Sequence, residues 1–254
     1  TAAELPNDFN FTMPTPKIHA CPEHGEYRGQ ASDAPCPVCR DALDHTASQI
    51  TRDWLTFHRW RAAGLPSRLE HKTRASWRPS NAADRQTLGA VNSYVAQIHE
   101  NAGAGRGLVL LGGPGLGKSH LLAALVCDAV EAGAERARYF SWPALIQAHR
   151  QNQHESGSPL HAAIDADFLA IDELGALPAS EWEGGQLFRV IDARYAEQRP
   201  TVIASNLTAH QLPAAIGERA ADRLRESCLW LSMSGESKRG KATLPPDPVR
   251  FAEP

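Results

Sequence analysis

The stretch VLLGGPGLGKSHLLAAL, residues 109–125, places a glycine-rich loop between two apolar runs. It spells G-x-x-x-x-G-K-S, and it follows a predicted strand and precedes a predicted helix, as this phosphate-binding motif requires. Glycines let backbone N–H groups approach phosphate oxygens, and the helix start favours negative charge. We interpret the loop as a phosphate cradle rather than a chance glycine-rich turn. Its predicted nucleotide-binding residues are Gly112, Gly113, Pro114, Gly115, Leu116, Gly117, Lys118, Ser119 and His120.

Apolar strands alternate with helices after this point. Strands are expected at 107–111, 137–141, 167–171, 200–205 and 228–233, and helices near 118–132, 142–152, 181–197 and 217–227. Continuously apolar strands that alternate with helices imply a parallel sheet covered on both faces, and so an α/β fold.

The segment DFLAIDELG provides acidic groups where such a strand ends. Ligands bind at the carboxyl ends of parallel strands. We predict that Ser119 and Asp172 hold Mg²⁺, that Lys118 reaches the β- and γ-phosphates, and that Glu173 polarises an attacking water. The alternative is a strand with a solvated acidic end.

Two later segments carry further polar candidates. Asn206, in PTVIASNLT, follows a buried strand and could contact the γ-phosphate or the water, although Asn is also common in turns. In GERAADRLRES, Arg219 and Arg223 share one helix face. They are either a solvated face or an arginine finger that reaches the ATP of a neighbouring subunit.

In this order, the motifs resemble those of AAA+ ATPases of the DnaC/IstB group, which comprises replicative-helicase loaders and transposition helper ATPases. The resemblance covers roughly residues 60–240, including AAGLPSRLEHKT. It implies a five-stranded sheet of order 5-1-4-3-2, ATP hydrolysis in an oligomer, and a reduced C-terminal helical lid. It also implies that Asn206 is sensor 1, that Arg223, or less well Arg219, is the arginine finger, and that Arg239 touches nucleotide. Ala204 and Leu116 depart from the commoner family residues, without removing a ligand.

A Cys/His cluster precedes the ATPase region. Cys21, His24, Cys36 and Cys39 follow the pattern C-x2-H-x11-C-x2-C, which suits a tetrahedral Zn²⁺ with three sulfurs and one nitrogen. His19 is a less well spaced substitute, and chance surface thiols are the alternative. Cys127 and Cys228 are expected to be core thiols. A similar CPxHGEY…CPxC segment precedes the ATPase in many phage-type DnaC-like loaders, which favours the loader over the transposition helper.

The N-terminal region also contains a predicted helix over 41–62, with apolar residues spaced by 4, 3, 4 and 3. Its aromatic residues either grip a helicase or pack against the zinc module. A second helix is predicted over 82–101. The expected domains are 1–62 (tail, zinc module and helix), 63–106 (linker), 107–240 (ATPase core) and 241–254 (tail).

Contacts to nucleic acid must be local, because the net charge is only −3. Residues 52–78 carry seven Arg or Lys against two acids, with three tryptophans between them, which suits a polyanion, an acidic partner surface or a solvated linker. The resemblance implies single-stranded DNA in the pore of an ATP-bound spiral, with Phe140, His149 and Arg150 as candidate contacts.

These features together predict an ATP-dependent loader that places a hexameric replicative helicase on single-stranded DNA. The alternatives are an IstB-like helper that delivers a transposase, and a nucleotide-switched adaptor with little hydrolysis. We find no secretory signal in residues 1–20 and no apolar run of the ~20 residues that cross a bilayer. A cytoplasmic protein with no membrane partner is therefore expected.

Overall fold

The computed structural model describes residues 17–29, 36–151, 158–175 and 180–238. Its contacts divide the chain into two units, Thr1–Leu55 and Thr56–Pro254, and the division falls within a helix. In the first unit, β1 (Lys17–Cys21) and β2 (Gly25–Gly29) form an antiparallel hairpin. Helix α1 (Pro37–Ala62) begins four residues earlier than the apolar spacing predicts, because a proline suits the first turn of a helix.

The second unit contains the ATPase-like core. Its elements in chain order are α2 (Ala82–Ala96), α3 (Ile98–Gly103), β3 (Gly107–Leu111), α4 (Lys118–Glu131), β4 (Ala137–Ser141), α5 (Trp142–Gln151), α6 (Pro159–Asp165), β5 (Phe168–Asp172), α7 (Glu181–Ala196), β6 (Thr201–Ser205), α8 (Leu212–Ile216), α9 (Glu218–Ser227) and β7 (Cys228–Ser232). The predicted strands and the helices that alternate with them are confirmed to within about two residues.

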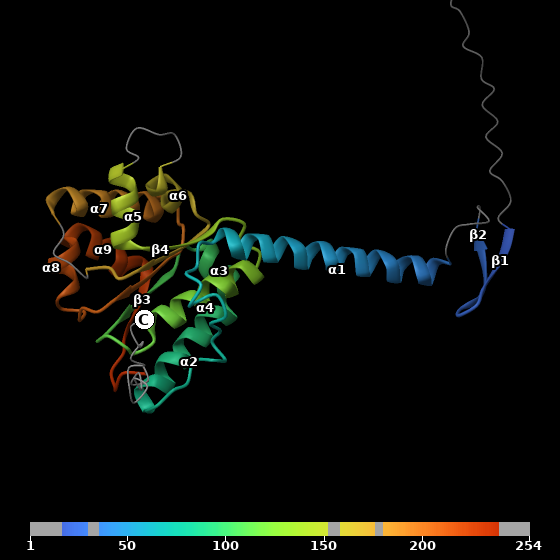
Figure 1. Ribbon diagram of the computed structural model, residues 1–254, viewed down its shortest axis with the longest axis horizontal. Helices are drawn as coiled ribbons and strands as arrows, with labels where there is room; N and C mark the ends of the chain where they lie inside the picture. Colours follow the sequence, from blue (N-terminus) through green and yellow to red (C-terminus); the bar gives the residue numbers. More distant parts are fainter. Residues whose placement is uncertain (1–16, 30–35, 152–157, 176–179, 239–254) are drawn as a thin grey trace, which may run out of the picture. The chain divides into compact units, whose positions relative to one another are not determined.

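The five strands of this unit form one parallel sheet in the order β4-β5-β6-β3-β7. If these strands are counted from β3 as the first, the order is 5-1-4-3-2, as the family resemblance implied. In Figure 1, α5, α6, α7 and α9 lie on one side of the sheet, and α2, α3 and α4 lie on the other. The predicted α/β fold is therefore correct.

Alternate strand residues supply the two cores between these layers. Leu108, Leu110 and Tyr139 face the side that includes α2 and α4, whereas Val109 and Leu111 face the side that includes α7 and α9. This alternation follows from the period of two in a strand. All five residues of β3, β5 and β6 are buried, and the middle three residues of each strand are apolar because both faces of the sheet are covered.

The predicted helix over 82–101 is wrong in one respect, because the chain breaks at Gln97 into α2 and α3. The apolar spacing continues across the break, since both helices bury residues on the same core. The short helices α6 and α8 and the β1–β2 hairpin have too few residues for a periodic pattern and were not predicted. Among the described residues, no helix has both the length and the apolar character needed to cross a membrane.

Candidate ATP site and metal centre

The phosphate-binding loop connects the end of β3 to the start of α4. Gly115 and Gly117 have φ values of 81° and 89°, in the left-handed region that favours glycine. A Cβ atom at Gly115 would lie 2.0 Å from Ser237 Oγ, and one at Gly117 would lie 2.4 Å from Trp77 Nε1. These two glycines are therefore required by both the backbone conformation and the close approach of two distant segments.

Lys118 is the first residue of α4 and is only 6% exposed. Its Nζ donates hydrogen bonds to the carbonyl oxygens of Gly112, at 2.6 Å, and Gly113, at 2.7 Å. The ammonium group is thus held inside the loop, where the motif requires a cation for phosphate oxygens.

The acidic pair lies at the carboxyl end of β5. Asp172 is 4% exposed, and its Oδ1 accepts the backbone N–H of Glu173 at 2.9 Å. Tyr139 on β4 donates its hydroxyl to Asp172 Oδ2 at 2.5 Å, and burial together with the Asp172 charge raises the pKa of Tyr139. Glu173 has φ of 59°, a strained conformation of the kind found at functional sites. Its Oε2 accepts a hydrogen bond from Ser141 Oγ at 2.8 Å.

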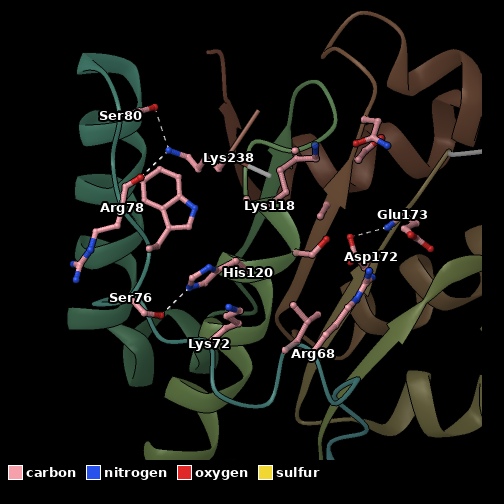
Figure 2. A pocket seen from close by; sticks show the side chains of 18 residues that line it. Arg68, Lys72, Ser76, Arg78, Ser80, Lys118, His120, Asp172, Glu173 and Lys238 are labelled. Carbon is pink, nitrogen blue, oxygen red and sulfur yellow. Dashed lines mark hydrogen bonds between the residues drawn. The ribbon is translucent and has the colours of Figure 1, made fainter. Parts of the chain in front are cut away.

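One cavity of about 640 Å³ brings the predicted groups together (Figure 2). The predicted residues that line it are Gly115, Gly117, Lys118, Ser119, His120, Asp172, Glu173 and Asn206. Gly112, Gly113, Pro114 and the buried Leu116 complete the loop without lining the cavity. Arg219 and Arg223 do not line it, and Arg239 lies outside the described residues.

One part of the cavity wall was not predicted. It comes from the segment between α1 and α2, which contributes Arg68, Leu69, Lys72, Ser76, Trp77, Arg78 and Ser80. Trp77 is 2% exposed, and its buried Nε1 has no hydrogen-bond partner in the part of the chain that the structure describes. Two signals pointed to this segment, the resemblance of AAGLPSRLEHKT to the family and the basic, tryptophan-containing composition of residues 52–78, but neither assigned a role to single residues.

The segment after β7 reaches the same wall. Lys238 donates from its backbone to Gly115 O at 2.8 Å, and its Nζ contacts Asp84, Ser80 and Arg78 O. Burial acts to raise the pKa of Asp84, but hydrogen bonds from Lys238 and Ser80 lower it overall. Lys238 Nζ also stands 4.3 Å from the centre of the Trp77 ring. The C-terminal segment is thus attached to both the phosphate loop and α2.

The two candidate arginines of α9 differ in their contacts. Arg223 donates its Nε to Asp192 Oδ1 at 3.2 Å, and its guanidinium lies 4.6 Å from the centre of the Tyr195 ring. Arg219 is exposed, and no hydrogen bond or ion pair joins it to the described part of the chain. Arg223 would have to leave an intramolecular ion pair to reach a neighbouring subunit, whereas Arg219 would not.

The DNA candidates on α5 are engaged within the unit. The rings of His149 and Trp182 are stacked, with centres 5.9 Å apart. Arg150 pairs with Glu183 at 2.9 Å and lies 5.0 Å from the Trp182 ring. Phe140 packs against a core cluster. His149, Arg150 and Trp182 therefore form a basic and aromatic group at the C-terminal end of α5, and Phe140 on β4 is not part of it.

The Cys/His cluster converges in the first unit. The ligand atoms of Cys21, His24, Cys36 and Cys39 all lie within 4.8 Å of one another. The sulfurs of Cys21 and Cys39 are 3.8 Å apart, and His24 Nδ1 lies 3.6, 3.6 and 3.4 Å from the sulfurs of Cys21, Cys36 and Cys39. A tetrahedral zinc with ordinary bond lengths has edges of about 3.8 Å between sulfurs and about 3.5 Å between sulfur and nitrogen. The residues therefore fit this ion.

The thiols of the cluster differ in acidity. The backbone N–H groups of Glu23 and His24 and the His24 ring lower the pKa of Cys21 to about 6, whereas a hydrogen bond with Cys36 and burial raise the pKa of Cys39. Cys39 N donates to Cys36 Sγ at 3.3 Å. Cys127 and Cys228 lie outside the cluster, and burial raises the pKa of both, to about 11 for Cys228. The side chain of His19 is not among those described.

The chain is similar to known proteins over the region that contains this site. The chain is 27% identical over 161 residues to the replicative helicase loader DnaC of Escherichia coli K12, an alignment that covers 61% of this chain and 64% of the relative's length. It is 33% identical over 143 residues to the IS21 putative ATP-binding protein of Pseudomonas aeruginosa, covering 53% of this chain and 52% of that protein.

The fold is also found among solved structures. A crystal structure of the DnaC helicase loader matches with a TM-score of 0.61 at 22% identity, and it covers 66% of this chain and all of that chain. The model of the family described as IstB-like ATP binding protein matches residues 44–244, which include every motif of the cavity. The chain therefore belongs to the IstB-like ATP binding protein family and is a DnaC/IstB-type AAA+ ATPase by fold.

Proposed function

We propose that this chain is an ATP-hydrolysing loader that holds a hexameric replicative helicase and helps to place it on single-stranded DNA. The observation that carries the proposal is the cavity in which the phosphate loop and the acidic pair meet, in a chain similar to a replicative helicase loader. The alignment spans less than two thirds of that loader's length. That this chain binds the same kinds of partner is therefore part of the proposal.

The chemistry follows from the cavity residues. The loop N–H groups and Lys118 would bind the triphosphate, and Asn206 would contact the γ-phosphate or the attacking water. The Ser119 hydroxyl and the Asp172 carboxylate line the same cavity and are hard oxygen donors, which fit Mg²⁺. Bound there, Mg²⁺ would neutralise charge on the phosphates. Glu173, exposed beside Asp172, would orient the water and accept its proton.

Hydrolysis is proposed to need a second subunit. Arg223 remains our first candidate for the cation supplied in trans, and Arg219 is the second. Neither lines the cavity of its own subunit, as expected for a group that acts on a neighbour.

We propose that residues 1–62 bind the helicase. Among the described residues, α1 has no buried side chain, and Leu43, Ile50, Trp54 and Phe57 are 50–64% exposed. This exposure favours an interface over packing against the zinc module, because large exposed apolar side chains mark binding surfaces. The cluster of cysteines and His24 would hold Zn²⁺ and give this small unit its folding energy.

For single-stranded DNA, we propose Phe140, His149 and Arg150 as contacts, together with Trp182, whose ring stacks on His149. Aromatic and basic side chains bind single strands without sequence preference, and the affinity falls with salt.

Changing Glu173 to Gln is expected to lower ATP turnover by at least about a hundredfold, because a positioned general base contributes about 10²–10⁴ to the rate. ATP binding should be unchanged, since the amide keeps the size of the side chain. Steady-state phosphate release and binding of a fluorescent ATP analogue measure the two effects. Glu181→Gln, on the exposed first turn of α7, is the control. Unchanged turnover in Glu173→Gln would favour the nucleotide-switched adaptor.

The loader function is tested by mixing the protein with candidate replicative helicases, ATP and single-stranded DNA, and then sizing the complexes. We expect a complex with one helicase, and we expect Ile50→Asp to abolish it while ATP binding is retained. Gln49→Asp, a charge change at an already polar position of α1, is the control. Failure to capture any helicase, with capture of a transposase instead, would favour the IstB-like helper, for which the IS21 relative is the specific observation.

A further inference from the structure

The phenol of Tyr139 makes a contact that the nucleotide-binding motifs do not specify. Tyr139 and Asp172 are each 4% exposed, and the phenol hydroxyl donates to Asp172 Oδ2 at 2.5 Å. We propose that Tyr139 is a positioning residue that orients the Asp172 carboxylate for Mg²⁺. This inference rests on the proposed ATPase function and extends it to a residue outside the phosphate loop and the acidic pair.

The sheet register explains how the two side chains meet. Tyr139 pairs with Ala170 across β4 and β5, and Asp172 is two residues further along β5, on the same face. Such diagonal neighbours are within reach of a long aromatic side chain. The backbone N–H of Tyr139 donates to Ala63 O at 2.8 Å, which attaches β4 to the segment that forms the unpredicted part of the cavity wall.

Two hydrogen bonds fix the orientation of the Asp172 carboxylate. Its Oδ1 accepts from Glu173 N at 2.9 Å, and its Oδ2 accepts from Tyr139, so each carboxylate oxygen has a donor. Each oxygen keeps a second lone pair. Hydrogen bonds to ligating carboxylates fix their direction, and loss of such a partner typically weakens metal binding about 10–100-fold. Without the phenol hydroxyl, the buried carboxylate would lose one of its two fixed contacts.

Tyr139→Phe removes this hydroxyl and keeps the ring. In the full-length chain, we expect the MgCl₂ concentration that gives half of the maximal thermal stabilisation by ATP to rise about tenfold. Binding of a fluorescent ATP analogue in EDTA should be unchanged. The control is Tyr94→Phe, because Tyr94 is 6% exposed and donates its hydroxyl to Arg106 O at 2.8 Å, outside this cavity. A merely structural phenol would lower the melting temperature and leave the Mg²⁺ requirement unchanged.

Asp172→Asn, which keeps an oxygen that can accept the phenol hydroxyl, completes a double-mutant cycle. If Tyr139 acts through Asp172, then Tyr139→Phe adds no further rise in the Mg²⁺ requirement in the Asp172→Asn background, and an additive rise overturns the proposal. Superimposed Mg²⁺ curves for Tyr139→Phe and Tyr94→Phe also overturn it. A parent chain that shows no Mg²⁺-dependent stabilisation by ATP overturns the proposed function itself, so the two failures are distinguishable.

Discussion

A Lys118→Ala chain is expected to lose ATP affinity by at least about a hundredfold, and its ATP hydrolysis with it. The side chain is almost fully buried, and its ammonium group already lies within the loop, bonded to Gly112 O and Gly113 O. Alanine removes the cation that would face the phosphates. One hydrogen bond between charged groups contributes about 1.5–3 kcal/mol, roughly 10–100-fold in affinity, and the ammonium group has three donors. The loss of one preorganised donor also costs about 10²–10³ in rate. Equilibrium binding of a fluorescent ATP analogue and phosphate release measure the two losses.

The control is Arg136→Ala. Arg136 comes directly before β4, and its Nη2 lies 2.8 Å from Asp167 Oδ1. This ion pair is at the amino-terminal ends of the strands, whereas the cavity is at their carboxyl ends. This variant loses a cation and an ion pair but should bind ATP like the parent. Circular dichroism should show that both variants are folded. If Lys118→Ala takes up ATP as tightly as the parent, the interpretation of the cavity as an ATP site is wrong.

Removal of zinc is expected to unfold the first unit and leave ATP binding intact. We expect about one zinc per chain in protein purified without chelator, and none in Cys36→Ser. Structural zinc contributes about 10–16 kcal/mol in small zinc peptides, much more than a hairpin and part of a helix can supply. Elemental analysis measures the metal, and limited proteolysis reports the folding of residues 17–55.

Cys127→Ser is the matched control for the cysteine change. Cys127 lies on α4, and its sulfur accepts a hydrogen bond from Trp60 Nε1, a role that a serine oxygen can also fill. This variant should keep its zinc. Zinc retained in Cys36→Ser at the level of the parent would contradict the proposed metal centre.

Much of the fold could be predicted because it depends on local patterns. The five strands were predicted from apolar runs, and the reason is strongest for β3, β5 and β6, because a strand buried on both faces admits few polar residues. The break at Gln97 was missed because Val91 and Ile98 face the same core on both sides of it. The sequence left two interpretations of the apolar face of α1, a helicase interface or packing against the zinc module. Apolar spacing shows that a helix has such a face but does not show what covers it.

By itself, the sequence determined the phosphate loop, the acidic pair and the Cys/His cluster. These depend on backbone conformation and ligand spacing within short segments, so a motif is sufficient to specify them. Only the tertiary structure decided that Tyr139 holds Asp172, 33 residues away, and that Lys238 contacts Asp84, 154 residues away. The pairing of buried polar groups depends on which strands and loops become neighbours, and no spacing along the chain encodes it.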